Sequence, residues 1–148
     1  MANSVHQDRF GPDWPLGNIV VTAPGTQVSI MSLVDSGNVN SPSTATGPGA
    51  SASDEYTVNA QAIIIQPGKG GGATKLSANT GNIYLVRRPT AGGGGTADVG
   101  VVIAMIKPTD PPYTLQASAV VKNIFNLYRY FLDADTANDA ANVTAIIE

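Results

Sequence analysis

The chain has 148 residues, of which 43% are hydrophobic and only 13% are charged, with a formal net charge of −3 at pH 7. This hydrophobic share excludes a fully disordered chain, and the length fits one domain. The 16 glycines and 10 prolines disfavour a helical bundle, and the absence of cysteine excludes disulfides, thiolate metal sites and cysteine nucleophiles.

The first segment of the chain, residues 1–17, is expected to be an extended N-terminal arm. Pro12 and Pro15 flank Trp14, and two prolines so placed forbid a regular helix. Large aromatic side chains serve both cores and interfaces. Trp14 therefore either covers one end of its own core or anchors the arm on a neighbouring subunit.

Two short bursts rich in β-branched residues follow the arm. Ile19–Thr22 and Val28–Val34 are separated by a Pro-Gly turn signal, which favours two strands over a helix. Residues 36–55 offer almost no side chain that could pack, and they predict a long flexible surface loop. A domain linker is the alternative, but the segment before it is thin for an independent core.

The rest of the chain contains short strands joined by glycine and proline turns. Val99–Lys107 is apolar on both faces, which predicts a strand that is central or sandwiched between layers. A turn or short helix to about Asn126 is expected before a strand over Leu127–Asp133. The other predicted strands are Tyr56–Gln66, Ile83–Arg88, Tyr113–Ala117 and Val143–Ile147.

These elements together predict the fold class and the domain organisation. Seven to nine short strands with at most one short helix indicate an all-β chain. We expect a β-sandwich, jelly-roll-like, as a single domain over residues 18–148.

Two segments look like ligand loops but lack the diagnostic residues. Asp133–Asp139 resembles the start of a calcium loop, yet Asn138 and Thr144 stand where an EF-hand needs glycine and glutamate. A hairpin turn is the better interpretation. Pro67–Thr74 has the composition of a phosphate loop, but Lys69 is followed by glycines and not by Ser or Thr in a helix.

Other functional classes find equally little support. The single histidine, His6, lies in the arm, where no rigid scaffold would place it against a nucleophile. The basic residues are scattered, so we expect no nucleic-acid partner. The first residues lack the apolar segment of a secretory signal, and Val99–Ile106 is far too short to cross a bilayer. We expect no enzyme, no cofactor, no metal site and no membrane partner.

Aromatic residues cluster in the later predicted strands. They could form a sugar-binding face, although in small sandwiches such residues more often belong to the core or to a subunit interface. These residues are Tyr113, Phe125, Tyr128, Tyr130 and Phe131.

Four phrases of the second half occur in a recognisable order. They are AQAIIIQPGK, NTGNIYLVRR, PPYTLQA and YRYFLDADTANDAANVTAIIE, and their most distinctive parts are Asn79–Tyr84, Thr114-Leu115 and Phe131–Asp135. This order, over roughly Tyr56 to Glu148, resembles small β-sandwich structural proteins of tailed bacteriophages. The resemblance implies a non-enzymatic virion component of the capsid decoration, or cement, type.

Such a protein would be made in the host cytoplasm and would lie on the capsid surface, bound to the major capsid protein of the same virion. We expect it to be a dimer or trimer that stabilises the assembled shell by mass action and by many identical contacts. The alternative is a head-fibre or tail-associated module that binds a host receptor or a carbohydrate. The residues expected at the partner interface are Phe10, Trp14, Leu16, Tyr128, Tyr130 and Ile147.

Overall fold

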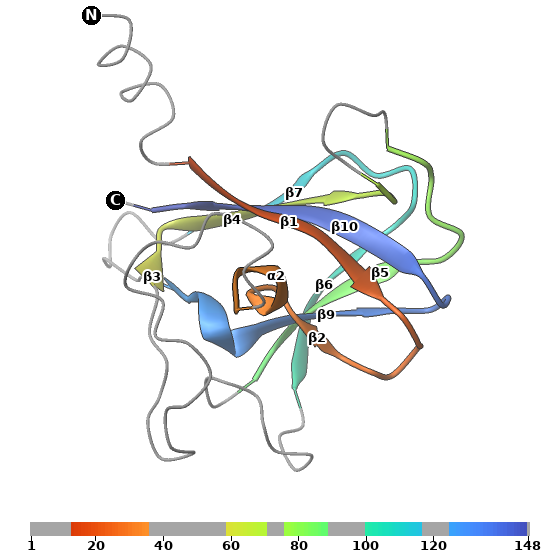
Figure 1. Cartoon of the computed structure of the whole chain (residues 1–148), viewed down its shortest axis with the longest axis horizontal. Helices are drawn as coiled ribbons and strands as arrows, with labels where there is room; N and C mark the ends of the chain where they lie inside the picture. The colour runs from red at the N-terminus through yellow and green to blue at the C-terminus, as the bar shows by residue number, and fades with distance from the viewer. Residues whose placement is uncertain (1–12, 36–58, 71–75, 89–99, 117–124, 148) are drawn as a thin grey trace, which may run out of the picture.

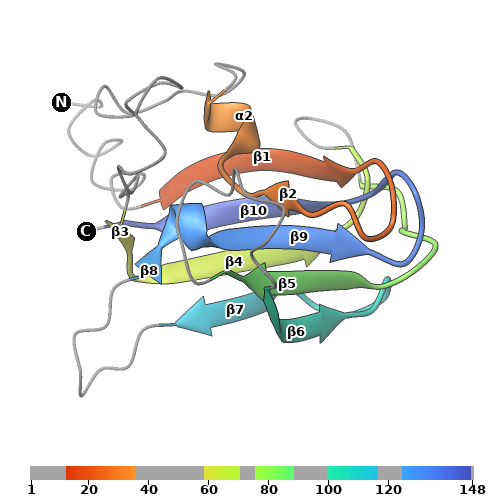
Figure 2. The ribbon, with the colours of Figure 1, turned by 90° about the horizontal axis from the view of Figure 1, so that it is seen from below.

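Two four-stranded antiparallel sheets dominate the computed structural model, which describes residues 13–35, 59–70, 76–88, 100–116 and 125–147. Figure 1 shows the sheets as two layers, and in Figure 2 the sheet that we call sheet B lies in front of the other, sheet A. Sheet A has the order β1 (Asp13–Val21), β10 (Asp139–Ile146), β4 (Ala62–Pro67), β7 (Tyr113–Gln116). Sheet B has the order β2 (Val28–Ser29), β9 (Tyr130–Ala134), β5 (Ile83–Arg87), β6 (Val101–Ile106).

The path of the chain through these sheets is that of a jelly roll. The strands of the two sheets alternate along the sequence, except that β5 and β6 are neighbours in sheet B. Such a path builds two four-stranded layers from eight strands. A further pair, β3 (Asn59–Ala60) with β8 (Phe125–Asn126), lies apart from both sheets. The expected all-β class is confirmed.

One apolar core fills the space between the two sheets. Alternate residues of each strand point inward, as the two-residue period of a strand requires. Ile63 and Ile65 of β4 are fully buried, whereas Ile64 between them is half-buried and Gln66 after them is exposed. The largest fully buried side chains in the described residues are Leu16, Ile19, Ile30, Met31, Ile63, Ile65, Ile83, Leu85, Ile106, Leu127, Leu132 and Val21.

A β-bulge in β1 keeps the apolar residues of that strand on the core side. Leu16 and Ile19 are three residues apart, so in a regular strand they would face opposite sides. The pairing of β1 with β10 shifts between Pro15 and Gly17, and Gly17 has a φ of 100°. The extra residue of the bulge shifts the inward–outward alternation of the side chains by one position. Leu16 and Ile19 therefore both face the core, where they are buried.

The structure corrects the expected end of the N-terminal arm. β1 pairs with β10 from Asp13 onward, so residues 13–17 belong to sheet A and not to an arm. Trp14 is 8% exposed and Leu16 is fully buried, both within the core. Pro15 is tolerated because β1 is an edge strand, where a missing N–H leaves no neighbour unpaired. Residues 1–12 and 36–55, the rest of the arm and the expected loop, lie outside the described residues.

The predicted strand Val28–Val34 is wrong beyond Ser29. The Ser29 hydroxyl accepts a hydrogen bond from the Met31 N–H at 3.1 Å, and this local bond competes with a strand ladder. The chain then forms the one-turn helix α2 (Ser32–Asp35), which lies beside β1. Val34 of α2 joins the core, so the apolar residues of this burst are still buried.

The remaining predictions differ mainly at their boundaries. Strands β5 and β7 confirm two predicted segments, and Tyr56–Gln66 contains β3 and β4, which extends to Pro67. Leu127–Arg129 forms a 3₁₀ turn before β9, so the expected strand starts three residues later. The last strand begins at Asp139, earlier than expected. The expected turn or short helix before Asn126 lies mostly outside the described residues.

Burial of Trp14 can be read directly, because it is the only tryptophan of the chain. We expect blue-shifted fluorescence that acrylamide quenches poorly in the dilute chain, and a red shift on unfolding. Trp14→Ala should lower the free energy of unfolding by about 3–5 kcal/mol, since it leaves a cavity in the core. Red-shifted, readily quenched emission from the folded chain would contradict the placement in β1.

Candidate functional site: a buried polar clasp and an apolar edge strand

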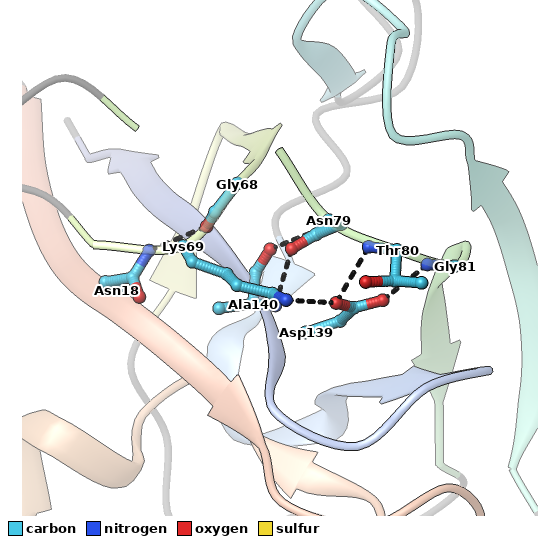
Figure 3. Close-up of polar contacts among 8 residues, drawn as sticks. All are labelled: Asn18, Gly68, Lys69, Asn79, Thr80, Gly81, Asp139 and Ala140. Atoms are coloured by element: carbon cyan, nitrogen blue, oxygen red, sulfur yellow. Dashed lines mark hydrogen bonds and ion pairs between the residues drawn. The ribbon is translucent and has the colours of Figure 1, made fainter. Parts of the chain in front are cut away.

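A buried carboxylate ties the start of β10 to the loop before β5. The Asp139 side chain has no exposed surface, and it accepts hydrogen bonds from the N–H groups of Thr80 at 3.0 Å and Gly81 at 2.6 Å. The Lys69 ammonium lies 3.1 Å from its Oδ1 atom. Figure 3 shows these three donors converging on the carboxylate. The contacts join sheet A to the segment that leads into sheet B.

The neighbouring residue of β10 is held by an asparagine. The Asn79 side chain donates to the Ala140 carbonyl at 2.8 Å and accepts from the Ala140 N–H at 3.0 Å. Its amide thus satisfies both backbone groups of a buried residue, as a neighbouring strand would. Asn79, Thr80 and Gly81 with Lys69, Asp139 and Ala140 form what we call the polar clasp (Figure 3).

The polar clasp holds an ionised carboxylate between the two sheets. Burial would raise the pKa of Asp139, but the N–H groups of Thr80 and Gly81 and the Lys69 ammonium outweigh it, so this pKa is lowered. Asp139 therefore stays ionised and hydrogen-bonded at neutral pH. In the described residues every buried side-chain nitrogen and oxygen has a hydrogen-bond partner.

The other acidic residues near the clasp point to separate partners. Asp133 accepts the Gly25 N–H at 2.9 Å, and Asp135 accepts the Tyr84 hydroxyl at 2.9 Å. In the part of the chain that the structure describes, no group of three potential ligands could hold a metal ion. The segment once considered as a calcium loop, Asp133–Asp139, contains the turn between β9 and β10, in which Asn138 has a φ of 68°. It joins β9 to β10 in different sheets, so the expected hairpin is corrected to a turn between layers.

The outermost strand of sheet B presents a row of apolar side chains to solvent. On β6, Val101 is 62% exposed, Val102 57%, Ile103 37% and Met105 50%. We call these four residues the β6 edge. Sequence patterning placed this strand in the centre of a sheet or between layers, and that prediction is wrong. Among the described strands β6 pairs only with β5, and no labelled strand of sheet B lies on its other side in Figure 2.

The register of β6 against β5 explains which side chains are left outside. Val102 pairs with Val86 and Ala104 with Leu85, so Ile103 is an extra residue that forms a β-bulge. Met105 pairs with Tyr84 on the outer face of the sheet. Only Ile106, at the end of the strand, is buried in the core.

The other three edges are shorter, more polar or interrupted by proline. β2 has two residues, and β1 contains Pro15 and a bulge. β7 alternates half-buried residues with exposed Thr114 and Gln116. Proteins protect sheet edges with short strands, charges and proline. Residues 101–106 contain neither a charge nor a proline, so β6 is the least protected edge of the described residues.

Most of the residues predicted for a partner interface are instead inside the molecule. We expected their segments to remain incompletely buried by their own chain, but Trp14, Leu16, Tyr128 and Tyr130 are core residues because both sheets close over them. Ile147 is partly buried against the same core. Phe10 lies outside the described residues. Sequence patterning missed the β6 edge, whose signal was the absence of any polar residue on either face.

The aromatic side chains that the structure describes do not form the sugar-binding face considered from the sequence, and the Phe125 side chain lies outside the described part. Tyr128, Tyr130 and Phe131 are buried, and the Arg88 guanidinium lies 3.9 Å above the Phe131 ring centre. Tyr113 is half-buried. A shallow groove of about 410 Å³ on sheet A is lined by Asn18, Gln66, Asn142 and neighbours, without an aromatic residue. It lacks the stacking surface by which aromatic rings hold sugars.

Comparison with protein-family models, with curated proteins and with solved structures found no match to this chain. None of the helices in the described ranges has the length and apolar character that crossing a bilayer requires.

The polar clasp predicts how stability depends on pH. The folded pKa of Asp139 lies below its ordinary value of 3.8, so its contribution is complete above that value and is lost as pH falls through the folded pKa. Asp139→Asn should lower the free energy of unfolding at pH 7 by about 3–5 kcal/mol, because it leaves buried donors without their charged acceptor. Urea titrations between pH 2 and about pH 7 measure both effects.

The gap between wild type and Asp139→Asn should shrink at low pH. Asp135→Asn is the matched control, because Asp135 is exposed and its substitution should change stability by less than about 1 kcal/mol. A gap of the same size at every pH would show that Asp139 does not contribute through its charge.

Proposed function

We propose that this chain is a non-enzymatic structural protein of a virion, a capsid decoration protein that binds and stabilises the head shell. The observation that carries the proposal is the β6 edge, an uncharged apolar strand that the described residues of the chain leave uncovered. Apolar groups in contact with water favour any partner that covers them, by about 25 cal/mol for each Å² buried. A protein with such a surface is suited to act within an assembly.

The composition supports a role as a covered subunit. Charged residues make up 13% of the chain. Small polar and apolar groups are cheaper to dehydrate than charged ones, so contact with other coat subunits loses little hydration energy. The segments Asn79–Tyr84 and Phe131–Asp135 resemble phage structural proteins, and this resemblance is the reason for proposing a virion as the assembly. The partners would be the major capsid protein and other copies of this chain.

The mechanism would be thermodynamic. A subunit that binds the assembled shell and not its free components stabilises the shell by its binding free energy. Linked copies bind more tightly than single ones, since the second contact becomes intramolecular. The polar clasp suits such a task because it fixes the start of β5 to sheet A without a disulfide, and β5 is the strand that pairs with β6 in the described residues.

Co-sedimentation with purified, expanded heads of the phage that encodes the chain tests this function. We expect wild type to sediment in many copies per shell. The double variant Val102→Lys/Met105→Lys should bind at least about tenfold more weakly, a loss of about 1.4 kcal/mol or more. Val20→Lys is the matched control. Val20 is also an exposed apolar residue, 41% exposed, but on the edge strand of sheet A.

The same experiment separates the alternatives. Copies confined to a vertex or a tail would favour a head-fibre or tail component, and specific binding on a glycan array would favour a carbohydrate module. Wild type that fails to sediment with heads would overturn decoration as the function. Equal loss of binding in Val20→Lys would remove the β6 edge from the mechanism.

A further inference from the structure

We propose that β6 pairs antiparallel with β6 of a second copy of this chain about a two-fold axis, joining two B sheets into one continuous eight-stranded sheet. The inference deepens the proposed function, on which it rests, by naming the occupant of the β6 edge. A two-fold pairing places the same strand on both sides of the contact, as isologous dimers require.

The first argument is that β6 is an open strand and not merely an apolar patch. Its outer side faces no strand in the described residues, so it offers a row of backbone N–H and C=O groups. An added strand satisfies these groups and covers the side chains at once. The four exposed residues run over Val101–Met105, which is nearly the whole of β6.

The second argument is the distribution of charge along sheet B, which selects a copy of the same chain. At the Val101 end, Arg87 lies between Val101 and Tyr130 in the register of the sheet. Arg88 follows Arg87, and its N–H donates to the Arg129 carbonyl at 2.8 Å. Three arginines therefore mark this end as basic.

The opposite end of sheet B is acidic. Ile106 pairs with Ile83, which pairs with Ala134, and Asp133 and Asp135 flank Ala134. Asp110 follows β6 and accepts the Lys107 N–H at 2.8 Å. Lys107 offsets one of these three negative charges. Sheet B is thus polarised from its basic end at Val101 to its acidic end at Ile106.

An antiparallel partner reverses this polarity. A two-fold axis brings the basic end of one copy beside the acidic end of the other at both sides of the contact. A parallel partner strand would oppose like charges instead. At physiological salt these charges act over roughly 8 Å, so they orient the pair while the apolar side chains hold it.

The β-bulge at Ile103 lies in the middle of β6 and locates the axis. A bulge disturbs regular pairing, and natural edges use bulges to discourage it. Pairing about an axis near Ile103 leaves regular strand on each side, whereas shifted registers place the bulge of one copy against regular strand of the other. Ile103 of the two copies should therefore lie close together.

The mass of the full chain in solution, with no other protein present, tests the inference. Sedimentation equilibrium should show a monomer–dimer equilibrium for wild type. Val102→Lys/Met105→Lys should raise the dissociation constant by roughly tenfold or more, because it places like charges in the contact. Val20→Lys should leave the constant unchanged, and thermal melts should show that both variants fold.

A cysteine substitution locates the contact, since the native chain has no cysteine. Under mild oxidation Ile103→Cys should give a disulfide-linked dimer, because the two thiols meet near the axis. Thr114→Cys, on the exposed edge strand of sheet A, should not.

Each result decides for or against the second copy. A monomer at all concentrations, or a dimer that both lysines leave intact, would overturn the inference. A monomer that still binds heads through β6 would overturn it while the proposed function stands, with the capsid protein as occupant. A β6 dimer that does not bind heads would support the inference and overturn the proposed function.

Discussion

An open sheet must end in an edge strand, and the backbone groups of that strand need a partner in water or in another chain. The two sheets of this sandwich have four edges, in β1, β7, β2 and β6. Three are shortened, interrupted or made polar. The fourth is six residues long, uncharged and apolar. In the function that we propose, this difference between the edges determines which side of the molecule would face an assembly.

Such an edge is useful only if it is held in place. In the described residues β6 pairs within sheet B with β5 alone, and β5 begins two residues after Gly81, the last clasp residue before it. Asp139 and Asn79 fasten that entry to β10, which is an inner strand of sheet A. The internal contacts of the clasp therefore support the outer surface, even though no residue of the clasp lies on it. Without cysteine, buried charge and hydrogen bonds supply this cross-sheet link.

Sequence patterning predicted the elements whose signal is local. β4, β5 and β7 follow from alternating apolar residues bounded by proline or glycine, a rule that depends only on neighbours along the chain. The bulge in β1 was missed, because its effect appears only when Leu16 and Ile19 are paired against β10. Core burial of Trp14 is one of the two alternatives that the sequence offers. Its place in a strand is not predicted, because the sequence favours an extended arm over residues 1–17.

The polar clasp could not be predicted from local patterns, because its residues come from segments that are far apart in the chain. Lys69 and Asp139 are 70 positions apart in the chain, and nothing in either segment indicates that they meet. Tyr128 and Tyr130 were predicted at an interface because aromatic residues suit both interfaces and cores. The residue type alone does not distinguish an interface from a core, whereas the structure places both tyrosines in the core.

The error over β6 is the most informative of these differences. A strand that is apolar on both faces is typical of one covered on both sides, which is why a central position was predicted. The pattern indicates that cover is needed, but it does not say which chain supplies it. In this fold the described residues of the chain leave Val101, Val102, Ile103 and Met105 in water. The same composition that predicted a central strand thus argues for a strand from outside, and in a two-fold dimer β6 becomes the central strand that its sequence suggests.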